Sequence, residues 1–231
     1  MKAVLFFCLL AVTGALSADS CYESVGMDCM EASNVLSLSS CNARYGDFSS
    51  GQNIVADELK AYANLHLERS YDYLLSSAYY SNYKTNRAGF SKLFRKLSDD
   101  AWEKTIDLIK HVTMRGDKMN FGQRTNQRTV ERKNYTVELH ELDALAKALD
   151  TQKELAERAF YIHREATRNA QNLHDPEIAQ YLEEEFVEYQ AKKIRDLAGH
   201  TNDLKGFVNV NNGQDLSLGL YLFDEYLQKV V

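Results

Sequence analysis

The chain has 231 residues, of which 45% are hydrophobic and 26% charged, a composition that suits one globular domain with a substantial core. Its formal net charge of −6 argues against a nucleic-acid partner, which would require a basic surface, and fits a surface that attracts cations. One proline and 11 glycines leave long uninterrupted stretches, which favours helices.

The first 17 residues have the pattern of a secretory signal peptide. Lys2 precedes an apolar stretch from Ala3 to Val12, and the small residues Ala15 and Ser17 follow. We expect cleavage after Ser17, or after the neighbouring Ala18, and a secreted product. No later stretch is long and apolar enough to cross a membrane.

Residues 18–51 form a polar segment that we expect to be an irregular arm stapled by a disulfide. Removal of the signal peptide leaves Cys21, Cys29 and Cys41, an odd number. In an oxidising compartment this indicates one internal disulfide and one cysteine for another chain, with a free buried thiol as the alternative. Asn134 begins an Asn-Tyr-Thr glycosylation sequon in another polar stretch.

A first long helix is predicted over about residues 52–82. Spacings of three and four place one set of residues on a single inward face that mixes aliphatic, aromatic and polar side chains: Leu59, Tyr62, His66, Ser70, Tyr73, Ser77 and Tyr80. A second apolar row consists of Ala63, Leu67, Leu74 and Ala78.

A second helix follows the short polar link 83–86 and is therefore an antiparallel neighbour of the first. It ends at Arg115-Gly116, a cation followed by a glycine. Its inward side consists of Phe90, Leu93, Phe94, Leu97, Ala101, Lys104, Leu108 and Val112. The polar stretch 117–137 is long for a loop and predicts a crossover along the outside of a bundle, where the sequon would be exposed.

Two further long helices are predicted. The third has an inward seam of Leu142, Leu145, Leu149, Gln152, Ala156, Ala159, His163 and Ala166. The fourth begins at Asp175-Pro176, a capping residue followed by proline, and its inner row is Ile178, Leu182, Phe186, Gln190, Ile194, Leu197 and Leu204. A turn over Gly206–Gly213 and a short fifth helix over Gln214–Gln228 complete the chain. The predicted domain, residues 52–231, is all-α: a ferritin-like four-helix bundle with one long crossover and a short fifth C-terminal helix.

Several stretches resemble ferritin subunits in register from about residue 53 to residue 227. They are the segment NLHLERSYDYLLSSAYY over residues 64–80, the segment SDDAWEK over 98–104 with Arg115-Gly116, the Asp175-Pro176 start, and LYLFD over 220–224. The signal peptide, the cysteine-bearing arm and the sequon resemble the secreted ferritins of insects, specifically their light chains.

In catalytic subunits of that family, a di-iron centre inside the bundle oxidises Fe(II). The resemblance carries its ligand positions onto His66, Tyr73, Ala101, Lys104, Gln152 and Gln190. The two positions that match are Tyr73 and Gln190, and no carboxylate remains where two hard cations would require one. Lys104 places a positive charge or a desolvated amine in the position of a ligand.

A scan of the histidines supports the same conclusion without any resemblance. The residues three positions before the six histidines are Ala63, Leu108, Val137, Phe160, Gln171 and Leu197, so the chain contains no Glu-x-x-His or Asp-x-x-His pair. The ferroxidase site is therefore expected to be inactive, with His66 and Tyr73 as ordinary core residues.

The second helix carries an acidic stripe, Asp99, Asp100, Glu103 and Asp107. Alone, such a stripe is typical of a solvated helix face. The family position implies instead that it nucleates ferric mineral on the inside of a cage. Glu183 matches an acidic residue of the family's three-fold iron channels and His163 a histidine near them, whereas a second channel acid is replaced by Gln180. Glu183 alone is also explained as a favourable charge near a helix N-terminus.

The resemblance further implies that Leu218, Leu222 and Tyr226 pack around the family's four-fold axis. We expect Cys21 to pair with Cys41 and Cys29 to link to a heavy chain, although spacing does not fix the connectivity. The leading hypothesis is a non-catalytic light chain in a secreted cage of twenty-four subunits that stores a ferric mineral core and contains a heavy-chain partner. The alternatives are a ferroxidase that uses His66, Tyr73 and Gln190, and a secreted helical signalling factor.

Overall fold

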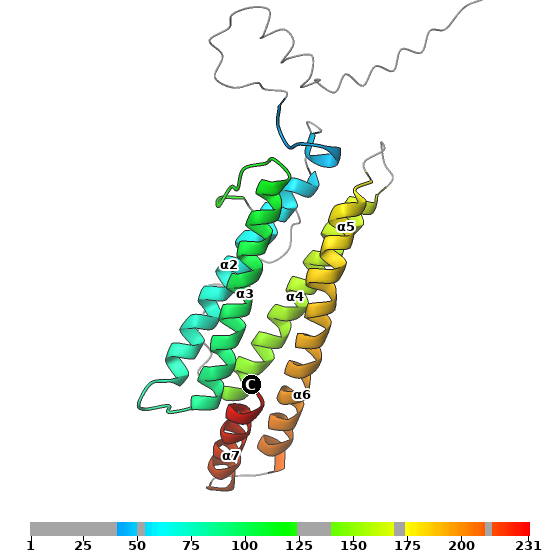
Figure 1. Cartoon of the computed structure of the whole chain (residues 1–231). Helices are drawn as coiled ribbons and strands as arrows, with labels where there is room; N and C mark the ends of the chain where they lie inside the picture. The colour runs from blue at the N-terminus through cyan, green and yellow to red at the C-terminus, as the bar shows by residue number, and fades with distance from the viewer. Residues whose placement is uncertain (1–40, 50–53, 124–139, 169–173, 211–213) are drawn as a thin grey trace, which may run out of the picture. The chain divides into compact units, whose positions relative to one another are not determined.

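Four long helical segments run side by side, and a shorter helix packs at one end (Figure 1). They belong to a computed structural model that describes residues 41–49, 54–123, 140–168, 174–210 and 214–231. The predicted signal peptide, Cys21, Cys29 and Asn134 lie outside these residues. Cys41 is disulfide-bonded, and because its partner also lies outside them, the pairing with Cys21 remains a prediction.

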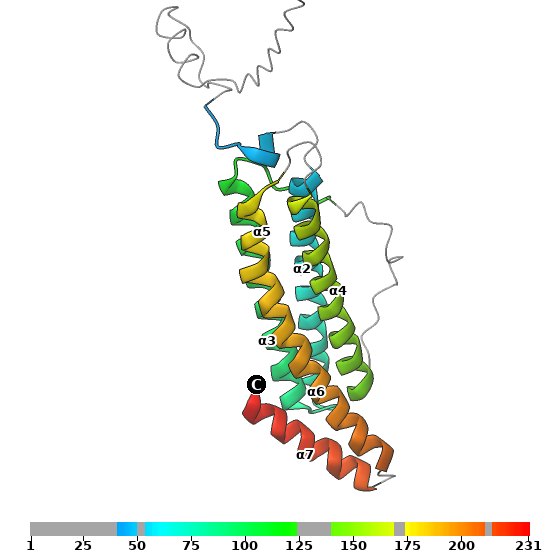
Figure 2. The same cartoon turned by 90° about the vertical axis from the view of Figure 1, so that its right-hand side faces the viewer.

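The first three segments are α2 (Ile54–Tyr80), α3 (Ala88–Met114) and α4 (Glu141–Thr167). In the fourth, α5 (Pro176–Leu182), the π-helical turn η2 (Glu183–Val187) and α6 (Glu188–Val210) follow one another without a break. The terminal helix α7 (Gln214–Val230) contacts α3 and α6 (Figure 2). A short 3-10 turn, η1 (Gly46–Ser49), precedes α2. The described residues contain no strand, which confirms the predicted all-α, ferritin-like bundle.

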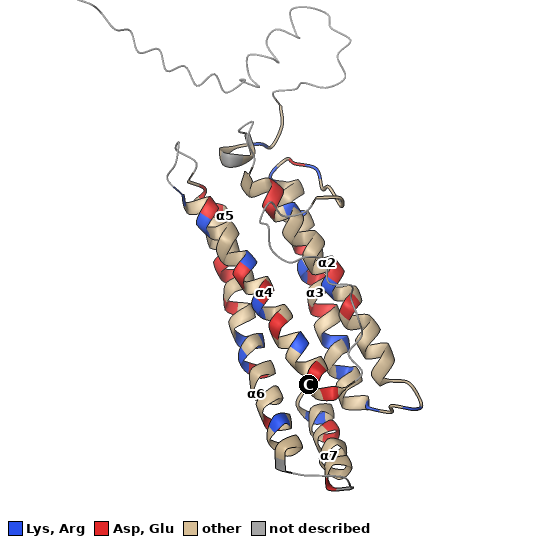
Figure 3. Ribbon diagram, turned by 180° about the vertical axis from the view of Figure 1, so that it is seen from behind, with Lys and Arg blue, Asp and Glu red and all other residues tan. Residues whose placement is uncertain are grey.

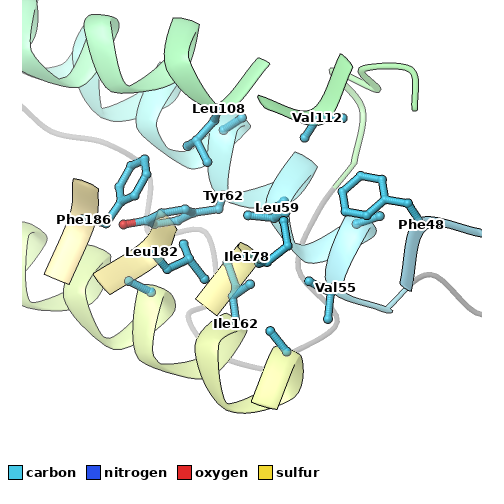
Figure 4. Packing of buried hydrophobic residues seen from close by; sticks show 14 of the residues in the cluster. Phe48, Val55, Leu59, Tyr62, Leu108, Val112, Ile162, Ile178, Leu182 and Phe186 are labelled. Carbon is cyan, nitrogen blue, oxygen red and sulfur yellow. The ribbon is translucent and has the colours of Figure 1, made fainter. Parts of the chain in front are cut away.

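The predicted inward faces are buried for the most part, but some of their residues are only partly buried: Lys104 on α3, Leu142, Leu149 and His163 on α4, and Ile194 on α6. All seven residues assigned to the inward face of the first helix are buried, from Leu59 to Tyr80. Four of them, Leu59, Tyr62, Tyr73 and Tyr80, belong to two apolar clusters that share the length of the bundle. The first, which includes Tyr62, Leu108 and Phe186, also takes in Phe48 from η1 (Figure 4).

The second cluster fills the other half of the bundle and reaches onto α7. It contains Tyr73 and Leu97 together with Phe223 and Leu227 of the terminal helix. The heptad-like spacing along each helix leaves a layer of polar residues at mid-height between the two clusters. In that layer, the four long segments bring their polar inward side chains together.

The end of α3 follows the predicted stop signal closely. Gly116 has a φ of +79°, a conformation that glycine adopts without strain. Its N–H donates to the carbonyl of Thr113, and the N–H of Asp117 donates to that of Val112, which is the Schellman arrangement.

The predicted start of the fourth segment is also confirmed. Asp175 accepts a hydrogen bond from the backbone N–H of Ile178, and Pro176 occupies the first turn. The sequence did not predict that Asp175 also pairs with Arg115, whose side chain is 1% exposed and lies over the rings of Tyr45 and Phe48.

One expectation about the end of an element was wrong. The predicted turn over Gly206–Gly213 begins too early, because α6 continues to Val210. Val208 packs against the cluster that includes Leu204 and Phe223, and this contact outweighs the low helix propensity of Gly206. In the second apolar row of α2, Ala63 is buried but Leu74 and Ala78 are exposed.

The terminal helix docks through one face and exposes another. The backbone N–H of Phe90 donates to the carboxylate of Asp224, and Gly89 lies so close to the backbone of Asp224 that a Cβ atom would clash. The row Leu218, Leu222 and Tyr226 lies on the exposed side, with exposed fractions of 59%, 55% and 45%. None of the described helices combines the length and the hydrophobicity that a membrane crossing requires.

Candidate metal centre

The polar layer at the middle of the bundle contains the six positions assigned to a di-iron centre. They come from all four long segments: His66 and Tyr73 from α2, Ala101 and Lys104 from α3, Gln152 from α4 and Gln190 from α6. All but Lys104 are fully buried, and Lys104 is partly buried. Five of the six positions therefore lie in the interior of the bundle, and their assignment to a di-iron site stays a prediction.

His66 is an imidazole in an almost entirely aromatic environment. Its ring packs edge-on against Tyr62 at 4.6 Å and against Phe186 at 5.6 Å between ring centroids. Neither ring nitrogen has a hydrogen-bond partner among the described residues. Burial, with a smaller contribution from the positive charge of Lys104, lowers the pKa of His66 to about 3, so the ring is neutral at neutral pH.

Tyr73 and Gln152 form a closed polar pair. The Gln152 amide donates to the Tyr73 hydroxyl oxygen at 3.0 Å, and the hydroxyl donates to the carbonyl of Ala148 at 3.4 Å. In this arrangement the phenol donates to the backbone and accepts from the amide. It matches the expectation that Tyr73 is a core residue with a hydrogen-bonded hydroxyl.

Lys104 makes an ion pair where the family has a histidine ligand. Its ammonium donates to Glu185 at 2.9 Å and lies over the rings of Phe186 and Tyr189, at 5.2 and 5.3 Å from their centroids. The cation is thus bound by a carboxylate and two aromatic faces from the fourth segment. The charge of Glu185 is thus matched by Lys104.

Gln190 has both amide atoms buried and without a hydrogen-bond partner in the described structure. The donors of the layer are therefore an imidazole, amides, a phenol and an ammonium, with no carboxylate among the six positions. Among the residues that the structure describes, no group of three or more His, Cys, Asp or Glu side chains is arranged to hold a metal ion. Two Fe(II) ions require anionic oxygen ligands, which this donor set does not supply.

A second ion pair connects α3 to α6 beside Lys104. The Lys193 ammonium donates to the carboxylate of Asp100, which also accepts a hydrogen bond from the Tyr189 hydroxyl. Tyr189 thus lies against both lysines, and burial together with the charge of Asp100 raises its pKa. The two ion pairs join α3 to the fourth segment across the polar layer.

The predicted acidic stripe is divided by these contacts. Asp100 is engaged by Lys193, and Asp99 accepts from the Arg95 guanidinium at 3.0 Å. Glu103 is exposed and Asp107 half-buried, and neither makes an ion pair within the described structure. Figure 3 shows acidic and basic residues interspersed along the helices, without one continuous acidic face.

The predicted channel residues lie together at η2. His163 and Glu183 are 2.7 Å apart between the imidazole Nε2 and a carboxylate oxygen, and the Gln180 amide donates to Glu184. The contact brings residues from α4 and the fourth segment into one exposed polar group. Its role in iron entry remains a prediction.

Sequence reasoning missed the partners Glu185, Tyr189 and Lys193. The acidic triplet that contains Glu185 was visible, but which of its members faces Lys104 depends on the π-helical turn, which shifts the register of the fourth segment. No local pattern indicates such a turn here.

Comparisons with known proteins agree with this geometry. A family model described as a ferritin-like domain matches residues 56–207. The chain is 73% identical over 224 residues to a ferritin light chain of Trichoplusia ni, with 97% of this chain and 96% of the relative covered. It is 42% identical to a ferritin light chain of Drosophila melanogaster, with the same coverage, and 33% identical to a ferritin heavy chain of Papilio xuthus over 68% of this chain and 72% of that one.

A solved structure gives the same result in three dimensions. The crystal structure of Trichoplusia ni secreted ferritin superposes with a TM-score of 0.86 and 73% sequence identity, covering 93% of this chain and all of the matched chain. The match spans the bundle whose polar layer lacks carboxylates. This chain is therefore a member of the ferritin family, of its secreted insect light-chain type.

Proposed function

We propose that this chain is a non-oxidising subunit of a secreted iron-storage cage in which a heavy-chain partner oxidises Fe(II). The observation that carries the proposal is the polar layer, where the six ligand positions hold no carboxylate and Lys104 is paired with Glu185. Iron storage is the role of the family, and the ferritin heavy chains among the relatives make a mixed cage a natural assembly.

Charge explains why the layer is unsuited to oxidation. Two Fe(II) ions bring four positive charges into a low-dielectric interior, where uncompensated charge is very costly. His66 and Gln190 are neutral ligands, Tyr73 supplies at most one phenolate charge, and the ammonium of Lys104 acts on His66 as a positive charge. A ferroxidase built on these three residues is therefore disfavoured.

For mineral growth, the contacts favour a smaller surface than the whole stripe. Asp99 and Asp100 already neutralise Arg95 and Lys193, whereas Glu103 and Asp107 remain available to ferric ions. Hard carboxylate oxygens suit Fe(III). We therefore assign nucleation of the ferric mineral chiefly to Glu103 and Asp107, with Glu183 and His163 at the entry channel.

A co-assembly series tests whether the heavy chain carries out the oxidation of Fe(II). The mature chain is mixed with an insect ferritin heavy chain in varied proportions, and the initial rate of Fe(II) oxidation and the particle size are measured for each mixture. Oxidation that rises with the heavy-chain fraction, at constant cage size, is the expected result. A rate that is independent of the heavy-chain fraction would contradict the proposal.

A further inference from the structure

A pocket with a basic lining opens where the end of α2 meets the start of α3. Its volume is about 560 Å³, within the range of about 300–1,000 Å³ that small-molecule sites occupy. Four cationic side chains line it, and Asp99 is the one acidic side chain in the lining: the cations are Arg87, Lys92, Arg95 and Lys96. The chain as a whole has a net charge of −6, whereas the side chains that line this pocket have a net positive charge.

Lys92 is the least compensated charge of the pocket, and Lys96 is the next lysine along α3. They lie four residues apart on one face of α3, a spacing at which like charges repel. The ammonium of Lys92 donates to the backbone carbonyl of Gln228 at 2.8 Å, and that of Lys96 to the terminal main-chain carboxylate of Val231 at 3.2 Å. Neither pairs with a carboxylate side chain in the part of the chain that the structure describes. Each ammonium has three N–H donors, so both keep donors for a further acceptor.

The two arginines also keep donors. Arg95 contacts Asp99 through Nε, and Arg87 contacts Glu141 through Nε. The terminal nitrogens of both guanidinium groups are therefore free of these contacts, and they are the pair that binds an oxyanion in bidentate fashion.

We infer that this pocket binds a phosphate group, either as the free anion or at the end of a small phosphate ester. Lys92, Lys96 and Arg95 would contact the phosphate oxygens, with Arg87 at the rim. A tetrahedral anion with several acceptor oxygens reduces the repulsion between the two lysines and accepts hydrogen bonds from N–H groups that have no acceptor within the described structure. The site goes beyond the proposed function, because neither oxidation nor nucleation involves these residues.

The test uses the iron-free cage, so its outcome is independent of iron storage. Inorganic phosphate and AMP are titrated calorimetrically at low ionic strength. Saturable binding of one phosphate group per chain is expected, and the double substitution Lys92→Gln with Lys96→Gln should weaken it by at least about tenfold. Tighter binding of AMP would assign the site to a phosphate ester, and tighter binding of phosphate to the free anion.

Two control variants keep the result interpretable. The pair Lys192→Gln and Lys205→Gln removes the same charge from α6, away from the pocket, and should leave the affinity unchanged. The pair Lys92→Arg and Lys96→Arg keeps the charge and should retain binding. An absence of saturable binding with both probes, or an equal loss in both Gln pairs, would overturn the inference.

Discussion

His66 should make the stability of the bundle unusually sensitive to mild acid. Folding lowers its pKa from 6.5 to about 3, so the folded chain keeps the ring neutral while the unfolded chain protonates it below pH 6.5. The unfolded state then binds more protons, and stability falls as the pH drops from 6.5 towards 3. Above pH 6.5 this contribution to stability is fully present.

The size of the effect follows from the unfolded pKa alone over much of this range. A pH of about 5 lies about 1.5 units below the pKa of 6.5 of the unfolded imidazole. At about 1.36 kcal/mol per unit, the free energy of unfolding is then lower by about 2 kcal/mol. For a chain of this size, such a loss lowers the melting temperature by about 4–8 °C. The exact folded pKa does not matter here, provided that it lies well below 5.

The perturbation that isolates this effect is His66→Phe. Phenylalanine keeps an aromatic ring against Tyr62 and Phe186 but cannot take up a proton. The free energy of unfolding of both iron-free proteins is measured by denaturant titration at about pH 7.5 and about pH 5, at one fixed protein concentration because assembly contributes to apparent stability. Unfolding is followed by circular dichroism.

We expect the native chain to lose about 2 kcal/mol more than His66→Phe between the two pH values. Burial also lowers the pKa values of His111 and His200, but both residues are present in the two proteins, so their contributions cancel in the difference. Equal losses in the two proteins would refute the assignment of His66 as a buried neutral base.

Three further predictions concern single contacts. Arg115→Leu removes the cation that pairs with the buried Asp175 and should lower the free energy of unfolding by about 3–5 kcal/mol in denaturant titration. The control Arg164→Leu, at an exposed pair, should change it by less than about 1 kcal/mol. Similar losses in both variants would show that the buried pair contributes little. Gly89→Ala places a methyl group against the backbone of Asp224 and should lower the free energy of unfolding by at least about 1–3 kcal/mol. Gly199→Ala, which has open space around it, should raise the free energy of unfolding by about 0.5–1 kcal/mol. Thermal unfolding measures both, and an unchanged stability of Gly89→Ala would mean that α7 does not dock as described. Glu103→Gln combined with Asp107→Asn should roughly halve the initial rate of mineral growth in a mixed cage, because two carboxylate sites for ferric ions are lost. Light scattering follows the growth. A larger effect from Asp99→Asn would show that mineral nucleates on a different surface.

Periodicity predicted the bundle well because burial follows the helical repeat. The seven inward residues of α2, the capping Asp175 and the left-handed Gly116 all lie where spacing and capping rules placed them. These features depend on local chemistry, which a sequence displays directly.

Features that depend on the relation between helices were not predictable. The end of α6 at Val210 depends on packing against α7, and the pairs Lys104–Glu185 and Lys193–Asp100 depend on the register set by η2. The interpretation of the polar layer as an inactive di-iron site came from the resemblance to ferritins and stays a prediction. The contacts show that two of its remaining donors, His66 and Gln190, are buried without hydrogen-bond partners in the described structure.

Aerobic oxidation of Fe(II) by this chain alone, followed by stopped-flow absorbance, tests whether the polar layer supports ferroxidase activity. The comparison is the quadruple variant His66→Glu, Ala101→Glu, Lys104→His and Gln152→Glu, which restores the family's ligand types at the four changed positions. We expect only the background rate for the native chain and a fast phase for the restored variant. A fast, saturating phase in the native chain would contradict this expectation.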